Sequence, residues 1–82
     1  MNSISAMELN KIKEILDKKG ISQTWLAKQL GKSYSTVNAY SCNRVQPSLE
    51  TLFEIAKILE VGVLELINTE KNVRNRKYKS YI

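Results

Sequence analysis

Histidine is missing from this 82-residue chain, and cysteine and proline each occur once. Without histidine most metal sites and most general acid–base constellations cannot be built, and neither paired carboxylates nor a glycine-rich phosphate loop is apparent. The sequence therefore gives almost no support to an enzyme, and no cofactor or metal is expected. A single cysteine cannot form an internal disulfide, which fits a reducing cytoplasm as the expected location.

Helix-breaking residues are few, because three glycines accompany the single proline, while 43% of the residues are hydrophobic. This composition predicts one small, largely helical domain with a single core. No apolar run approaches the length of a membrane span, and no secretory signal is visible. We expect a short polar leader over residues 1–6, a helical domain over residues 7–67 and a tail over residues 68–82.

Residues 22–40, SQTWLAKQLGKSYSTVNAY, are the most informative segment of the chain. Ser22 and Ser33 are suitable N-caps, because a serine hydroxyl accepts a hydrogen bond from an unpaired amide of a helix's first turn. Gly31 falls where the first helix should end, since glycine takes the left-handed conformation there without strain. Two short helices joined by a tight turn are therefore predicted, over residues 23–30 and 34–42.

The apolar residues of this segment indicate how the two helices pack. Leu26, Ala27 and Leu30 recur at helical spacing and form a stripe, in which the small side chain of Ala27 lets a second helix cross close by. Val37 and Tyr40 are expected to face that stripe. The rest of the second helix is then left outward, as in a helix presented to the major groove of B-DNA.

The segment resembles the helix-turn-helix of the phage repressor and Cro family, also called the xenobiotic-response-element family. The resemblance continues through PSLETL, residues 47–52, and covers most of the chain, from about residue 9 to residue 67. Two positions depart from the family: Asn43 stands where glycine is usual after the recognition helix, and Ser41 where glutamate is common. Because asparagine tolerates the left-handed conformation, we expect the turn to survive.

The fold class expected from this resemblance is all-α, a compact five-helix lambda-repressor-like domain with a short basic C-terminal tail. The hydrophobic pattern places the first helix over residues 7–19, the fourth from about residue 48 and a short fifth over residues 63–67. Trp25 is expected at the edge of the core stripe, packed against the first helix or the C-terminal segment. Cys42 is expected to be a small apolar filler.

The function that the resemblance implies is sequence-specific DNA binding by a transcriptional regulator, a homodimer on an inverted repeat, such as the controller proteins of restriction–modification systems. Asn38 is the sharpest candidate for base recognition, because its amide can bond adenine through two hydrogen bonds. The expected base contacts are Tyr34, Ser35, Asn38 and Ala39. The expected contacts to the DNA backbone are Gln23, Lys28, Lys32, Ser33, Thr36, Arg44 and Gln46.

The cations near the recognition helix are separated from the acids, which fall on the fourth and fifth helices. Most of the net charge of +5 lies in residues 68–82, which contain five basic residues and one acid, a balance of +4. Three interpretations of this tail stay open: a strand that pairs with a second chain, an arm on DNA, or a disordered segment.

Assembly is indicated by Leu64, which falls where a polar residue is more common and is expected to be exposed. The expected dimer interface comprises Leu64, Ile67, Tyr78 and Tyr81. The alternative function is an interaction module, an antitoxin that holds a toxin protein through the fifth helix and the tail. No membrane partner is expected.

Overall fold

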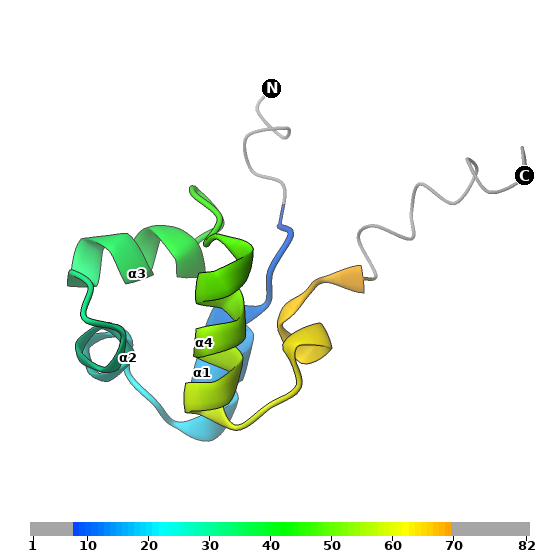
Figure 1. Cartoon of the computed structure of the whole chain (residues 1–82), viewed down its shortest axis with the longest axis horizontal. Coiled ribbons are helices and arrows are strands. Elements are labelled where there is room, and N and C mark those ends of the chain that lie inside the picture. The colour runs from blue at the N-terminus through cyan, green and yellow to red at the C-terminus, as the bar shows by residue number, and fades with distance from the viewer. Residues whose placement is uncertain (1–7, 70–82) are drawn as a thin grey trace, which may run out of the picture.

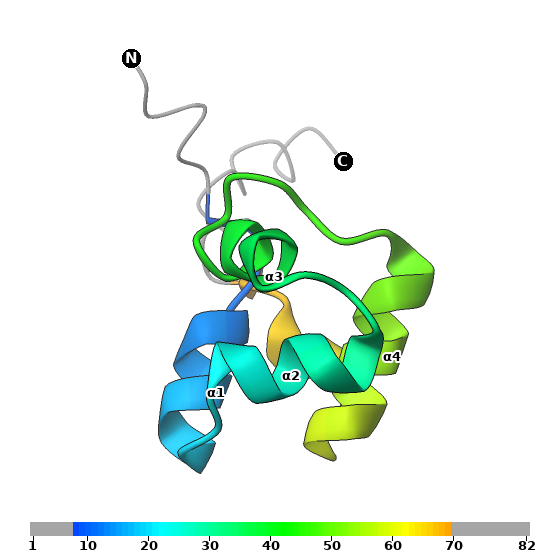
Figure 2. The same ribbon diagram turned by 90° about the vertical axis from the view of Figure 1, so that its left-hand side faces the viewer.

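The computed structural model describes residues 8–69. Four α-helices, α1 (Ile12–Lys19), α2 (Gln23–Leu30), α3 (Tyr34–Ser41) and α4 (Leu49–Leu59), are followed by a 3-10 helix, η1 (Val63–Leu66). α2 extends from α1 to α4 and α3 lies above it, as Figures 1 and 2 show. The all-helical fold class is confirmed for the described residues, and none of their helices has both the length and the apolar run needed to cross a bilayer.

One core holds the four α-helices and the 3-10 helix together. Its largest fully buried side chains are Ile12, Leu16, Leu26, Val37, Ile55, Leu59 and Leu66. Ala27 and Tyr40 are also buried, and Leu30 packs against the core from its margin. The predicted contact face between the two helices of the motif is therefore confirmed. Burial of apolar surface of this kind is the main favourable contribution to folding.

The residues at the helix ends have the capping roles predicted from the sequence. The hydroxyl of Ser22 accepts a hydrogen bond from the amide of Trp25 at 3.0 Å, and that of Ser33 accepts from Thr36 at 3.1 Å. Gly31 ends α2 with φ 68°, in the left-handed region. α2 has the bounds expected for it, while α3 ends at Ser41, one residue earlier than expected.

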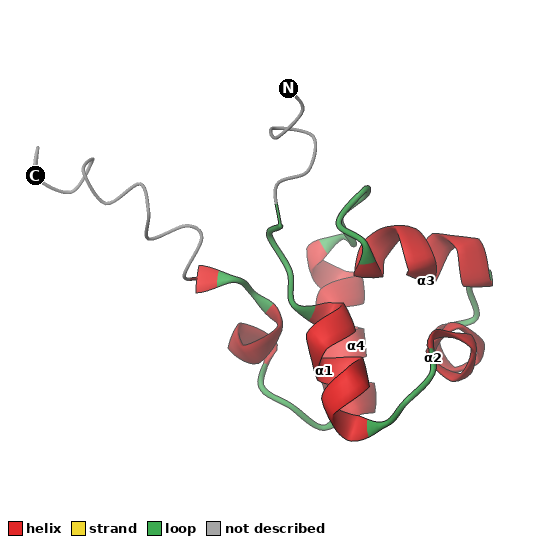
Figure 3. Ribbon diagram, turned by 180° about the vertical axis from the view of Figure 1, so that it is seen from behind, coloured by secondary structure: helices red, strands yellow, loops and turns green. Residues whose placement is uncertain are grey.

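The first helix begins at Ile12, so the expectation that it begins at about residue 7 was wrong. Residues 8–11, here called the N-terminal segment, are not helical because they pair with the chain that follows η1. The amide of Asn68 donates to the carbonyl of Leu9 and that of Lys11 to Leu66, each at 2.8 Å. Figure 3 shows this segment entering α1 beside the residues after η1.

The expected fifth helix is present only as a single 3-10 turn, so the count of five helices is not confirmed. Gly62 and Ile67 on either side of it have extended backbones, which leaves only four residues between them. The turn is closed by hydrogen bonds that span three residues, from the amide of Glu65 to Gly62 and from that of Ile67 to Leu64.

Cys42 is exposed at the end of α3, so the expectation of an apolar filler was wrong. Cys42 is the C-cap of α3, where the helix ends. Trp25 is 43% exposed and lines a recess with Gly20 and Ile21, at the junction of α1 and α2. Trp25 is therefore exposed beside this junction, and its packing against the first helix or the C-terminal segment stays a prediction. The leader and all but the first residues of the tail, including Tyr78 and Tyr81, lie outside the described residues.

Glu60 was not predicted from the sequence to end a helix, yet it ends α4 in the left-handed conformation, with φ 59°. We expect Glu60→Gly to raise the free energy of unfolding by about 0.5–1 kcal/mol, since relief of the left-handed strain exceeds the greater chain entropy of glycine when unfolded. Urea unfolding followed by circular dichroism measures the change.

Lys57→Gly is the matched control for this prediction, because Lys57 is an exposed charged residue of the same helix that lies within its last turn. Glycine there should lower the free energy of unfolding by about 1 kcal/mol. A loss of similar size in both variants would contradict the account of strain at Glu60.

Candidate nucleic-acid interface

α3 presents one face to the core and the other to the surroundings. Val37 and Tyr40 on the inner face are 0% and 8% exposed, whereas Tyr34 at the start of the helix is 54% exposed. Ser35 is exposed, and Thr36, Asn38 and Ala39 are half-buried. The residues expected to contact bases thus share the side of α3 that the core does not cover. In Figure 1 this helix lies at the margin of the domain.

Hydroxyl groups gather at the first turn of α3. Ser33 Oγ lies 2.9 Å from Thr36 Oγ1 and 3.2 Å from Ser35 Oγ, in addition to capping the helix. Three of the residues expected at the DNA surface are therefore arranged around one helix end. The amides and the dipole of such an end favour an anion, and hydroxyls can donate to phosphate oxygens.

A chain of hydrogen bonds joins three expected DNA contacts from three parts of the fold, and we call it the polar chain: Gln23, Asn38 and Arg44. The side-chain nitrogen of Asn38 donates to Gln23 Oε1 at 3.0 Å, and the Arg44 guanidinium donates to Asn38 Oδ1 at 3.1 Å. The Asn38 amide keeps one N–H and one oxygen lone pair beyond these bonds. Adenine requires one donor and one acceptor from such an amide.

The cations expected to contact the DNA backbone lie in the last turn of α2 and in the turn before α3. Lys28 and Lys32 are both exposed. Within residues 8–69 the one ion pair joins Lys13 to Asp17, at 3.4 Å, so these two lysines have no acidic partner there. The acids that the sequence assigned to the fourth and fifth helices are exposed on α4, at its end and on η1: Glu50, Glu54, Glu60 and Glu65. This arrangement leaves uncompensated positive charge beside α3.

Sequence reasoning missed a second polar cluster, which we call the asparagine cluster: Asn10, Asn43 and Gln46. Asn43 takes the left-handed conformation expected of it, with φ 61°, but its side chain is also buried. Its Oδ1 accepts from the amides of Leu9 and Asn10 and from Gln46 Nε2, at 2.9, 3.0 and 3.0 Å. No pattern within a short stretch of the sequence predicts the cluster, because Asn10 and Asn43 lie far apart in the sequence.

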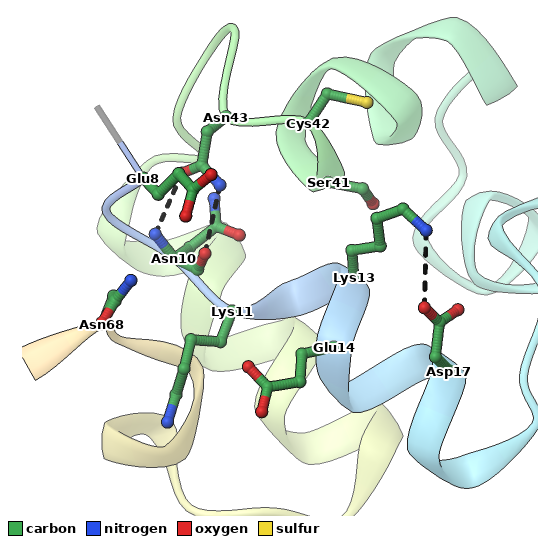
Figure 4. A pocket seen from close by; sticks show the side chains of 10 residues that line it. All are labelled: Glu8, Asn10, Lys11, Lys13, Glu14, Asp17, Ser41, Cys42, Asn43 and Asn68. Atoms are coloured by element: carbon green, nitrogen blue, oxygen red, sulfur yellow. Dashed lines mark hydrogen bonds and ion pairs between the residues drawn. The ribbon is translucent and has the colours of Figure 1, made fainter. Parts of the chain in front are cut away.

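A recess of about 460 Å³ lies on the α1 side of the end of α3, between α1 and the N-terminal segment (Figure 4). Lys11, Lys13, Glu14 and Asp17 supply both signs of charge to its lining. Ser41, where the resembled family often has glutamate, is buried there, and its hydroxyl has no hydrogen-bond partner among the described residues. None of the residues that line the recess is an expected DNA contact.

Comparison with known proteins agrees with this geometry. A sequence model of the helix-turn-helix family, of the XRE type, matches residues 12–66. The chain belongs to this family. A solved structure from Bacteroides fragilis, provisionally described as a DNA-binding protein, is similar to it with 43% sequence identity and a TM-score of 0.72. The similarity covers 73% of this chain and 97% of the other.

The search of curated proteins gives no match. Membership in the helix-turn-helix family nevertheless supports DNA as the partner and transcription regulation as the role. It implies a regulator in place of an enzyme.

The cap at Ser33 can be tested without DNA. Ser33→Ala removes the hydroxyl that accepts from the Thr36 amide, and we expect the free energy of unfolding to fall by about 1 kcal/mol. Ser35→Ala is the matched control, since Ser35 is exposed on the same turn, and its effect should stay within about 0.5 kcal/mol. If urea unfolding showed the same loss of unfolding free energy in both variants, Ser33 would not be the cap.

Proposed function

We propose that this protein is a transcriptional regulator that binds a specific inverted-repeat operator as a homodimer, with α3 in the major groove. The polar chain carries the proposal. It sets the amide of Asn38 between α2 and the loop after α3, with a donor and an acceptor unused. An isolated surface asparagine is free to rotate, whereas this one is oriented before DNA arrives, which reduces the entropy lost on binding.

Base recognition in this proposal is centred on Asn38, which bonds an adenine in the major groove. Ser35 donates or accepts at a neighbouring base, while the Tyr34 ring and the Ala39 methyl contact thymine methyl groups. α3 has no arginine, so strong recognition of guanine is not expected from it.

Backbone contacts in this proposal come from both sides of α3. Lys28 and Lys32 neutralise phosphates on one side, and Arg44 does so from the loop. Gln23, Ser33 and Thr36 add neutral donors near helix starts. Gln46 has fewer free hydrogen-bonding groups than its exposure indicates, because its side-chain amide already donates to Asn43 Oδ1 and accepts from Asn10 Nδ2. One N–H of Gln46 is left for a phosphate.

The homodimer is supported by Leu64, which is 71% exposed on η1. Leu64 precedes Ile67, a half-buried residue that lines an apolar hollow with Leu52 and Pro47. A second copy packed on this face would place two α3 helices on one side of the duplex. Half-sites separated by about one turn of DNA, roughly 34 Å, would match that symmetry.

The proposal is tested by selecting binding sites from a random duplex pool and measuring the affinity of the enriched sequence across a salt series. An enriched inverted repeat with a steep salt dependence is the expected result. Enrichment of a single half-site would contradict the homodimer but not the binding of a specific operator. No enrichment, with only weak salt-sensitive binding, would overturn the operator-binding function and favour a protein partner.

Asn38→Ala should weaken binding to the selected operator by about 1–3 kcal/mol and relax preference at one base pair. The alanine variant loses the amide that the polar chain orients, while the inner face of α3 is unchanged. Binding to operators with each base at each position measures both effects. Unchanged affinity together with unchanged base preference would show that Asn38 does not read the sequence.

Lys32→Ala should weaken binding to all duplexes alike, and the slope of log affinity against log salt should flatten by about one. The lysine lies in the turn and contacts no base in the proposed complex. Lys18→Ala, at the exposed end of α1, is the matched control and should leave the slope unchanged. A loss confined to the operator would contradict the backbone role of Lys32.

A further inference from the structure

The loop after α3 leaves the helix through a left-handed residue. The amide of Asn43 donates to the carbonyl of Tyr40 at 3.0 Å, and the amide of Arg44 donates to that of Ala39 at 2.9 Å. This pair of bonds around a left-handed residue is the Schellman motif, in which Asn43 takes the position that usually holds glycine. Arg44 is the next residue, so its direction depends on how firmly Asn43 is held.

The side chain of Asn43 holds the loop more firmly than a glycine could. Its Oδ1 accepts three hydrogen bonds, and its Nδ2 donates to the carbonyl of Asn10 at 3.1 Å. Asn43 is 9% exposed, so these bonds are largely protected from water. Losing them would leave buried donors and acceptors unpaired, which is costly.

Asn10 extends the same cluster to three other parts of the fold. Its Nδ2 donates to the carbonyl of Tyr40 at 3.0 Å and to Gln46 Oε1 at 2.8 Å, and its Oδ1 accepts from the amide of Ile12 at 2.9 Å. Its backbone pairs with Ile67 after η1. One residue therefore links the start of α1, the end of α3, the loop and the segment after η1.

On the outer side of the same loop, Arg44 contacts Asn38 through the polar chain. The asparagine cluster and the polar chain are thus connected by a single peptide bond, between Asn43 and Arg44. We infer that Asn43 and Asn10 are positioning residues for DNA recognition, which hold the loop so that Arg44 meets Asn38 and a phosphate together. The inference rests on the proposed function. It gives the side chains of Asn43 and Asn10 a role that glycine at position 43 could not fill.

The test is a double-mutant cycle between Asn43→Gly and Arg44→Ala, with the duplex selected by the wild-type chain as the probe. Glycine keeps the left-handed backbone and removes only the side chain. Asn43→Gly should weaken binding about tenfold and flatten the salt slope by about one, since the Arg44 contact is lost. In the Arg44→Ala background the same substitution should have almost no further effect.

Ile55→Val is the control for lost stability, because Ile55 is fully buried on α4 and its aliphatic side chain makes no hydrogen bond to the asparagine cluster. It should lower the free energy of unfolding without changing the salt slope. Asn10→Ser is the second test variant, in case Asn43→Gly does not fold. Serine can still accept from the Ile12 amide but loses the bonds to Tyr40 and Gln46, and its effect should also depend on Arg44.

The outcomes separate the two claims. If the wild-type chain binds its selected operator while both asparagine variants act independently of Arg44, or leave the salt slope unchanged, the positioning role is overturned and the proposed function stands. If the wild-type chain shows no operator preference, the proposed function fails, and the positioning role for DNA recognition fails with it.

Discussion

Burial of Val37 beside Leu26 and Ala27 is the interaction on which the rest of the molecule depends. It fixes α3 by one face only, and the small side chain of Ala27 lets α2 and α3 approach closely. Because the inner face of α3 is satisfied by the core, its outer face is free to carry polar groups at little cost to stability. The fold and the candidate DNA surface therefore share one helix without competing for the same side chains.

The polar groups on and around α3 are ordered by bonds within the protein. Gln23 from α2 and Arg44 from the loop bind opposite ends of the Asn38 amide. Behind the loop, the buried side chain of Asn43 accepts from two backbone amides of the N-terminal segment. Such buried networks restrict a structure to one arrangement when all their members are paired. This restriction suits a surface that must match a fixed pattern of base edges and phosphates.

The features predicted correctly from the sequence are local ones. The serine caps and Gly31 depend on neighbouring residues, and the apolar stripe repeats within one or two helical turns, so their signals are contained in short windows. The missed features depend on residues far apart. Asn10 meets Asn43 and Gln23 meets Asn38 only after the helices have packed. The N-terminal segment has the apolar pattern of a helix, but pairing with the chain after η1 prevails over that propensity.

The candidate DNA contacts were chosen through family resemblance together with helical spacing, and the structure places the base-contact set on one side of α3. The bond between Gln46 and Asn10 could not be foreseen, because Asn10 lies far from Gln46 in the sequence. Glu60 was missed for a different reason. Glutamate has an ordinary helix propensity, and no sequence pattern indicates that Glu60 ends α4 in the left-handed conformation.

The pairing of Leu9 with Asn68 brings the two ends of the domain side by side, 2.8 Å apart at the hydrogen-bonded atoms. A short connection could therefore join them, and the chain could be reopened at an exposed turn such as the one at Gly20 while keeping the same order of helices in space. The two ends of the described domain therefore meet next to Asn10, the residue that supports the loop after α3.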